Sequence, residues 1–210
     1  MAADDYDETT GAPVYLGTGA PESGGDLTEV AAFAALVGTR LIGTTAERTA
    51  FDYAREGIAW WDTDDDTLYV HNGSGWDPVF HDWKSYTPTP TNLAPGNGTL
   101  VGRYARVGKL IHVVIELTAG TTTSISGGVS FALPVTPASA LNAADGVGVF
   151  RDNSTGDTFS LLALIAGGVI LPRAVNAAGT YASAVAVATT APVAIGSGDT
   201  IYLHASYRGA

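Results

Sequence analysis

The fold class is decided by residues 109–118, which read KLIHVVIELT. One face of this segment carries only aliphatic side chains: Ile111, Val113, Ile115 and Leu117. The opposite face is half apolar and carries Leu110, His112, Val114 and Glu116. An aliphatic residue at every second position is typical of a β-strand that has one face against a core. The segment therefore predicts a strand in the interior of a β domain.

Residues 98–210 repeat this kind of pattern. Short apolar or alternating segments are separated by turn-forming pairs such as Gly127-Gly128 and Asp152-Asn153. The segments that predict strands are Leu100–Val107, Lys109–Thr118, Val129–Leu133, Gly146–Arg151, Thr158–Ala166, Gly168–Arg173, Tyr181–Ala188 and Thr200–Tyr207. Many short strands in about 110 residues are typical of a β-sandwich. We therefore expect a mainly β protein whose C-terminal domain, residues 98–210, is a β-sandwich or jelly roll.

Two of these strands have outer faces that are more apolar than a solvated surface requires. The residues concerned are Leu110, His112, Val114, Tyr202 and His204. Such faces are typical of subunit interfaces, although scattered surface hydrophobics are also common. The two histidines lie mid-strand on strands that could pair, where a histidine is usually a packing residue. We predict that these five residues form a subunit interface, in which a histidine could line an axis between three protomers.

Composition excludes several classes of protein. The 210 residues contain no cysteine, so disulfides and thiolate metal sites are excluded. The net charge of −11 comes from residues 1–85, which hold 16 acidic and 4 basic side chains. This balance opposes nucleic-acid binding, which needs clustered Lys and Arg. Apolar runs are too short to predict a membrane span, and the acidic start is unlike a secretory signal.

The N-terminal part predicts an extended arm and a small module. Residues 1–25 combine an acidic run with frequent Gly and Pro, which disfavours a helix or a long strand. Residues 26–85 predict a helix over 27–37 and a short helix over 45–53, for which Thr44 or Thr45 is the N-cap. They also predict a hairpin whose strands are residues 57–62 and 67–71. All four tryptophans fall within this module, so we expect aromatic rings to form its core.

Residues 86–97 separate the module from the β domain. They begin with alternating Thr and Pro, which hold a chain extended, and they coincide with the change in charge. We therefore predict a semi-rigid Pro/Thr linker here.

Residues that could carry chemistry are few. Asp62, Asp64 and Asp66 alternate like the start of a calcium loop, but Thr67 stands at the position where such a loop needs glycine. The alternative is a hairpin turn in which these carboxylates accept local backbone N–H groups. A glycosidase needs two convergent carboxyls, whereas most acidic residues of 86–210 fall in predicted turns, where we expect water to keep them ionised. We predict no catalytic residue and no cofactor. A convergent carboxylate pair, or a Ser-His pair in one cleft, would favour an enzyme.

Two segments carry a resemblance to a known group of proteins. Residues 56–76, EGIAWWDTDDDTLYVHNGSGW, resemble a short module of tail and fibre proteins of tailed bacteriophages. Residues 96–109, GNGTLVGRYARVGK, with Ser130-Phe131-Ala132-Leu133-Pro134 and the closing GDTIYL of 198–203, are similar to a C-terminal β domain in minor tail and fibre proteins of phages that infect actinobacteria. The resemblance covers roughly residues 40–210.

This resemblance implies a structural protein of the virion, assembled in the host cytoplasm, and no enzyme. The protein would be a homotrimeric knob whose β domain attaches to a bacterial surface glycan, while the arm and module dock on other virion proteins. Docking is expected to use aromatic residues: Tyr6, Tyr15, Phe33, Trp60 and Trp61. A capsid-decorating or head-fibre protein is the alternative, followed by a glycan-degrading enzyme or a cellular carbohydrate-binding module. The resemblance assigns no ligand-binding residues.

Overall fold

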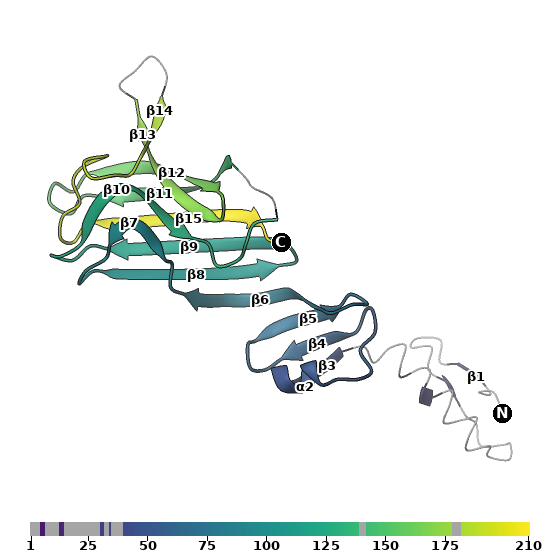
Figure 1. The fold of residues 1–210 in the computed structure, drawn as a ribbon. Helices are drawn as coiled ribbons and strands as arrows, with labels where there is room; N and C mark the ends of the chain where they lie inside the picture. The colour runs from purple at the N-terminus through teal and green to yellow at the C-terminus, as the bar shows by residue number, and fades with distance from the viewer. Residues whose placement is uncertain are drawn as a thin grey trace. The chain divides into compact units, whose positions relative to one another are not determined.

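The computed structural model describes residues 5–6, 13–14, 30, 31, 34, 40–138, 142–177 and 182–210. The chain divides into two compact units, Met1–Pro78 (unit 1) and Val79–Ala210 (unit 2). Both are built mainly of strands (Figure 1), which confirms the predicted mainly β class. No helix among the described residues is long and apolar enough to cross a bilayer.

Unit 1 contains a small mixed sheet. Strand β3 (Arg40–Gly43) pairs parallel with β4 (Ala59–Asp62), and β4 pairs antiparallel with β5 (Thr67–His71), which confirms the predicted hairpin. The sequence analysis missed β3. Two short strands nearer the N-terminus, β1 (Asp5–Tyr6) and β2 (Pro13–Val14), form a separate antiparallel pair.

Helix α2 (Thr45–Thr49) begins at the predicted cap, Thr44. Thr44 Oγ1 accepts a hydrogen bond from the Glu47 amide at 3.2 Å, and Glu47 Oε2 accepts one from the Thr44 amide at 2.8 Å. This reciprocal capping box satisfies two amides that the first turn would otherwise leave unpaired. The helix ends at Thr49, four residues earlier than predicted. Of the other predicted helix, over 27–37, only residues 30, 31 and 34 are described, and these are helical.

The core of unit 1 is aromatic, as the tryptophan content predicts. Trp60 is buried, and its ring lies 5.6 Å from that of Phe51 and 6.0 Å from that of Trp76. The Trp76 ring also meets His71 edge to face at 5.1 Å. Large rings let a short sheet and one helical turn exclude water, because each ring buries much apolar area. The fourth tryptophan, Trp83, lies in unit 2.

The boundary between the units corrects the prediction. Strand β6 (Trp76–Tyr86) begins in unit 1 and continues into unit 2, where residues 80–86 pair with β8. The change of charge near Tyr86 therefore lies eight residues beyond the structural boundary at Pro78. The two boundaries differ because charged residues mark surface that is exposed to solvent, whereas strand pairing decides which residues fold together.

The predicted linker over 86–97 is also wrong. Residues Pro90–Ala94 form strand β7, which pairs with β10, and the Leu93 side chain is buried in the core of unit 2. Strand β7 is the last strand in the sheet order, so one of its edges needs no partner. A proline is tolerated on such an edge strand because the missing N–H would point away from the sheet. The Thr-Pro pattern correctly predicted an extended backbone, but this backbone is a strand of the sheet and not a linker.

Unit 2 is an antiparallel sheet. Its remaining strands are β8 (Thr99–Val107), β9 (Leu110–Thr118), β10 (Ser124–Ala132), β11 (Asn142–Arg151), β12 (Thr158–Ala166), β13 (Val169–Asn176), β14 (Ser183–Ala186) and β15 (Thr200–Arg208). The strand order after β6 is β8-β9-β15-β11-β12-β13-β10-β7, with β14 paired to β13. The eight predicted strands are all present, with ends that differ by a few residues.

The core of unit 2 lies between two layers of this sheet. In Figure 1, β7 and β10 lie in front of β9 and β15, and buried residues from both layers form one cluster. The side chains that β9 contributes are those predicted from its alternation: Ile111, Val113, Ile115 and Leu117. Strand β15 contributes its own alternate residues: Ile201, Leu203, Ala205 and Tyr207. The predicted β-sandwich-like domain is therefore confirmed.

Candidate subunit interface on the outer face of unit 2

The face of the sheet opposite the core is continuous across β8, β9, β15 and β11. Because residues 111, 113, 115 and 117 of β9 point inward, its residues 110, 112, 114 and 116 point outward. The register aligns two rows on this face, which we call the outer face: Arg103, Val114, His204 and Val147 in one row, and Val101, Glu116, Tyr202 and Val149 in the next. A third row joins Ala105, His112 and Ser206.

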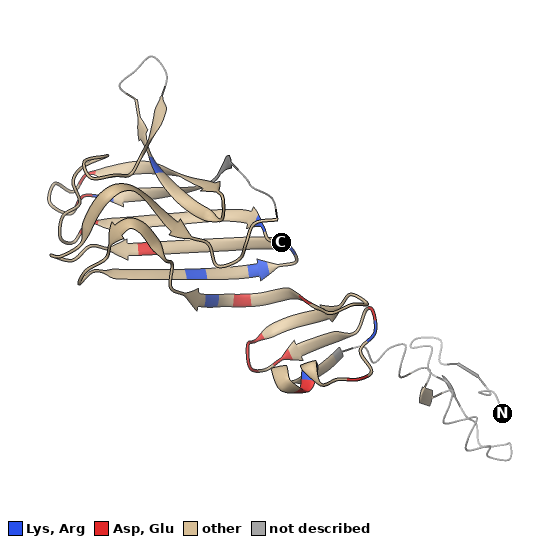
Figure 2. Ribbon diagram, in the orientation of Figure 1, with Lys and Arg blue, Asp and Glu red and all other residues tan. Residues whose placement is uncertain are grey.

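Large apolar side chains are exposed on all four strands of the outer face. The exposed fractions are 64% for Val107, 54% for Leu110, 59% for Val147, 37% for Val149 and 41% for Tyr202. They form two groups along the strands, Val107 with Leu110 and Val147 with Val149 and Tyr202, and the half-buried His112, Val114 and His204 lie between the groups. Single exposed hydrophobics are ordinary, but several on adjacent strands are typical of an interaction surface. Arginines and one glutamate lie among them: Arg103, Arg151, Arg208 and Glu116 (Figure 2). Apolar residues mixed with arginine are characteristic of protein–protein interfaces.

All five residues predicted as a subunit interface lie on this face. Leu110 and Tyr202 are exposed, while His112, Val114 and His204 are half-buried. Their grouping depends on the pairing of β9 with β15, which the structure places side by side. The sequence analysis missed Val107, Val147 and Val149, although Val147 and Val149 alternate with glycine in the predicted strand over 146–151. That alternation was the available signal.

The two histidines meet at the centre of the outer face. His112 Nε2 lies 2.8 Å from His204 Nε2, and the ring centroids are 4.3 Å apart with the ring planes at 66°. His112 Nδ1 lies 2.8 Å from Ser206 Oγ, and the Trp83 ring packs against the His112 ring with centroids 5.3 Å apart. Burial, together with the neighbouring His204, lowers the pKa of His112. This imidazole is therefore neutral at pH 7.

The Ser206–His112 contact is the kind of pair that would favour an enzyme if it lay in a cleft. It lies instead on the sheet face, and β9 pairs on both edges over residues 110–118. The amides of β9 are therefore engaged in the sheet and are not free to stabilise an oxyanion, which acyl-transfer chemistry requires. The contact positions the imidazole on the sheet face.

The Asp-rich turn of unit 1 uses its carboxylates for the fold. Asp62 is fully buried; its Oδ2 accepts from Arg48 Nε at 2.9 Å and from Thr45 Oγ1 at 2.8 Å, and its Oδ1 accepts from the Asp64 amide at 3.0 Å. Asp64 Oδ2 accepts from the Thr45 amide at 3.0 Å, while Asp66 is exposed with φ 48°. Both oxygens of Asp62 accept from protein donors, one of them the nearby Asp64 amide, which favours the hydrogen-bonded turn over a calcium loop at this residue. The donor to Asp64 comes from Thr45, outside the turn.

The environment of Asp62 sets its charge. Burial raises the pKa of Asp62, but the hydrogen bonds from Thr45, Arg48 and Asp64 outweigh it, so the pKa lies below its ordinary value. The Arg48 guanidinium lies 3.7 Å from the centre of the Tyr69 ring, and burial with a hydrogen bond to Asp65 raises the pKa of Tyr69 to about 12. Asp62 and Arg48 thus tie α2 to β4 through an ion pair.

Two aspartates of unit 2 that the sequence places in turns are not solvated. Asp152 and Asp199 are buried. Asp152 Oδ1 accepts from the Ser154 hydroxyl and amide, which lower the pKa of Asp152, and Asp199 accepts from the Asn153 and Gly196 amides. The donors to Asp152 lie in its own turn, whereas Asp199 accepts from Gly196 in its own turn and from Asn153 in a neighbouring one. Asp199 therefore links two turns of unit 2.

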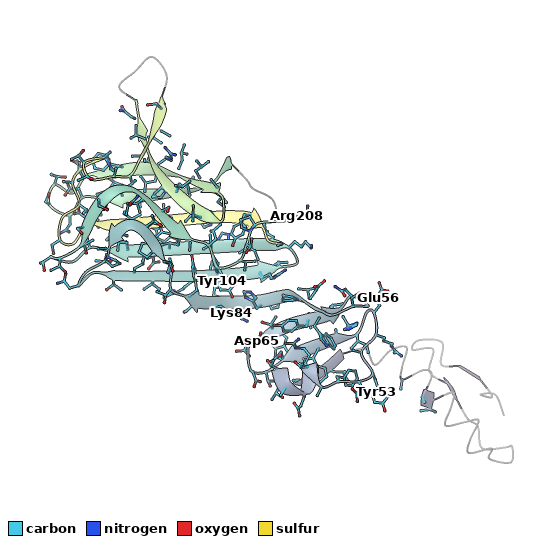
Figure 3. The ribbon with its side chains drawn as sticks, viewed as in Figure 1. Tyr53, Glu56, Asp65, Lys84, Tyr104 and Arg208 are labelled. Carbon is cyan, nitrogen blue, oxygen red and sulfur yellow. The ribbon has the colours of Figure 1, made fainter. Side chains whose placement is uncertain are left out.

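The residues predicted to dock on other virion proteins lie in different environments. Trp60 is 5% exposed, so it belongs to the core, and its prediction as a docking residue is wrong. Trp61 lies on the other face of β4, in register with Ile42 and Leu68. Tyr15, Phe33 and the Tyr6 side chain lie outside the described residues. Two exposed side chains that the sequence analysis did not select are Ile42 (71%) and Tyr53 (80%), the latter labelled in Figure 3.

One groove lies at the edge of unit 2, between β13, β14 and the segment around Pro192. Its volume is about 310 Å³, and its lining includes Phe159, Val175, Val185 and Pro192 with Asn176 as a polar residue. The lining of this groove is mixed, with polar atoms contributing nearly as much surface as apolar ones.

A scan against protein-family models and searches of curated proteins and of solved structures found no match.

Proposed function

We propose that this chain is a structural protein of a tailed-phage virion. In this proposal it assembles as a homotrimer through the outer face of unit 2, and unit 2 attaches the particle to a glycan on the bacterial surface. Unit 1 docks on other virion proteins. The resemblance of residues 56–76 and 96–109 supports the virion role, and the mainly β architecture is compatible with it.

The observation that carries the proposal is the set of exposed apolar side chains on the outer face. Five large apolar side chains on four neighbouring strands expose between 37% and 64% of their surface: Val107, Leu110, Val147, Val149 and Tyr202. Covering these side chains with a second copy removes apolar area from water, at about 25 cal/mol for each Å². Arg103, Arg151 and Glu116 supply polar contacts around them. A second copy of the same chain is the occupant we propose, because self-association gives the repeated subunit that a knob needs.

The first experiment measures the mass of the untagged protein in solution by light scattering at neutral pH. A trimer has three times the 21.5 kDa chain mass. Leu110→Asp and Val147→Asp place a charge on the outer face, so we expect each to produce monomers with unchanged circular dichroism. Val185→Asp is the matched control, because Val185 is also exposed but lies on β14. A wild-type monomer, or a trimer that both outer-face variants leave intact, contradicts the interface.

The second experiment tests the virion role directly. Antibodies against the protein are applied to purified phage particles and located by electron microscopy. Label at the tail supports the proposal, whereas label on the head supports a capsid-decorating protein. Absence of label from denatured as well as intact particles contradicts both. Binding of the fluorescent trimer to actinobacterial cells, with competition by purified cell-wall glycan, tests the attachment step separately.

A further inference from the structure

We propose that His112 and His204 form a binding site for a divalent transition-metal ion of the Cu²⁺ or Ni²⁺ type on the outer face of unit 2. The two imidazoles come from positions 92 residues apart, and pairing of β9 with β15 brings their Nε2 atoms within 2.8 Å. Both belong to the same chain, so the proposal does not depend on trimer formation or on the virion role.

The first observation that supports a metal site is how close together the two ring centroids lie. In a straight N–H···N hydrogen bond, two imidazoles hold their ring centroids about 5 Å apart. Two imidazoles that meet one ion at a right angle, with N–metal distances of about 2.0 Å, have nitrogens about 2.8 Å and centroids about 4.5 Å apart. The observed separations are 2.8 Å and 4.3 Å. These distances match the right-angle arrangement, which is the preference of tetragonal Cu²⁺ and Ni²⁺.

The second argument is the support around His112. Its Nδ1 lies 2.8 Å from Ser206 Oγ, so a proton on Nδ1 can be donated to the hydroxyl oxygen while Nε2 keeps its lone pair. Metal-binding histidines characteristically hold the second ring nitrogen in such a hydrogen bond, which fixes the tautomer and the ring orientation. The Trp83 ring further restricts the imidazole.

The surroundings limit the affinity. No third histidine, aspartate or glutamate joins the pair among the residues that the structure describes, so water would complete the coordination. Both rings are half-buried in the single chain, which leaves room for these waters before a second copy covers the outer face. Arg103 lies in the same row as His204, and its charge opposes a cation. We therefore expect micromolar binding by a two-histidine site. A tetrahedral ion such as Zn²⁺ should bind more weakly, because it needs the nitrogens farther apart.

The test uses untagged protein, stripped of metal with EDTA and then dialysed at pH 7.5. Titration calorimetry with NiCl₂ should show one saturable ion per chain. His112→Asn and His204→Asn should each weaken binding by at least about tenfold, and Ser206→Ala by about tenfold through loss of positioning. His71→Asn is the matched control, because it removes a half-buried histidine from unit 1, and it should bind like the wild type.

Two further measurements use the wild-type chain, so their results do not depend on whether the variants fold. Electron paramagnetic resonance with substoichiometric Cu²⁺ should show nitrogen couplings from two imidazoles. In imidazole ¹⁵N NMR, added Ni²⁺ should broaden His112 and His204 before His71 and His81. The proposed site is overturned if Ni²⁺ binding does not saturate or if the Cu²⁺ couplings come from fewer than two imidazoles. It is also overturned if Ni²⁺ broadens all four histidines equally. Light scattering on the same samples separates metal binding from subunit assembly.

Discussion

Unit 1 and unit 2 bury different kinds of side chain. The described part of unit 1 packs around the Trp60 ring and an ion pair between Arg48 and the fully buried Asp62. Unit 2 packs aliphatic and aromatic side chains between two layers, and its β9 and β15 bury every second residue. A short sheet has little area to bury, so large rings and hydrogen bonds make up part of its stability. A large sheet can rely on many ordinary hydrophobic contacts.

The comparison predicts that the two units respond to different mutations and can be followed separately. Trp60, Trp61 and Trp76 lie in unit 1, and Trp83 lies in unit 2. In a Trp83→Phe background, tryptophan fluorescence therefore reports on unit 1, while far-ultraviolet circular dichroism reports on both units. Urea unfolding followed by both signals is the measurement used below.

The largest effect is expected from Phe131→Ala in unit 2. Phe131 is fully buried in the core cluster, and its removal leaves a cavity that costs about 3–5 kcal/mol of unfolding free energy. The dichroism transition should move to lower urea, while the fluorescence transition of unit 1 stays in place. Phe131→Leu is the milder control. Equal movement of both signals would show that the units unfold as one and would contradict the comparison.

Asp62→Ala should affect unit 1 in the same selective way. The change leaves the Arg48 guanidinium without its acceptor, at 11% exposure, and should cost about 3 kcal/mol. The fluorescence transition should move to lower urea, and the later part of the dichroism transition should remain. Asp52→Ala, at an exposed position, is the control and should change stability by less than about 0.5 kcal/mol. A fluorescence transition equal to that of the control would refute the role given to the ion pair.

Acid should weaken unit 1 through the same carboxylate. The folded-state pKa of Asp62 is lowered, so its stabilising effect is complete above the unfolded value of about 3.9 and declines as the pH falls toward the folded value. The urea midpoint of the fluorescence signal should therefore drop as the pH falls below about 4. Asp62→Asn should flatten this dependence. Asp152→Asn should leave it unchanged, because Asp152 is bound within a loop of unit 2; the opposite result for either variant would overturn the assignment.

The smallest effect is expected at the helix cap. Thr44→Ala removes the side-chain acceptor for the Glu47 amide and should cost about 1 kcal/mol in unit 1. Thr49→Ala is the matched control at the other end of α2, where Thr49 Oγ1 donates to the Thr45 carbonyl at an exposed position. We expect little change there. If both variants shift the fluorescence transition equally, the capping box has no special role.

Most of the fold could be predicted where the pattern is local. The strands of unit 2, the hairpin over 57–71 and the cap at Thr44 were all indicated by alternation, turn residues or cap spacing. The missed strands lack such a signal. Residues 40–43 are too few for a periodicity, and residues 90–94 begin within the Thr-Pro alternation of residues 87–91, which also suits a linker. Only pairing with β10 makes the latter a strand.

The sequence alone determined which side chains of β9 and β15 point inward, because successive side chains of a strand point to opposite faces. It also located the half-apolar outer residues and the aromatic content of unit 1. Tertiary structure decided which distant segments meet. Only the pairing of β9 with β15 places His204 beside His112, and only the docking of α2 on β4 makes Asp62 a partner of Arg48. Local periodicity sets the direction of a side chain, whereas the packing of the whole unit selects its neighbour.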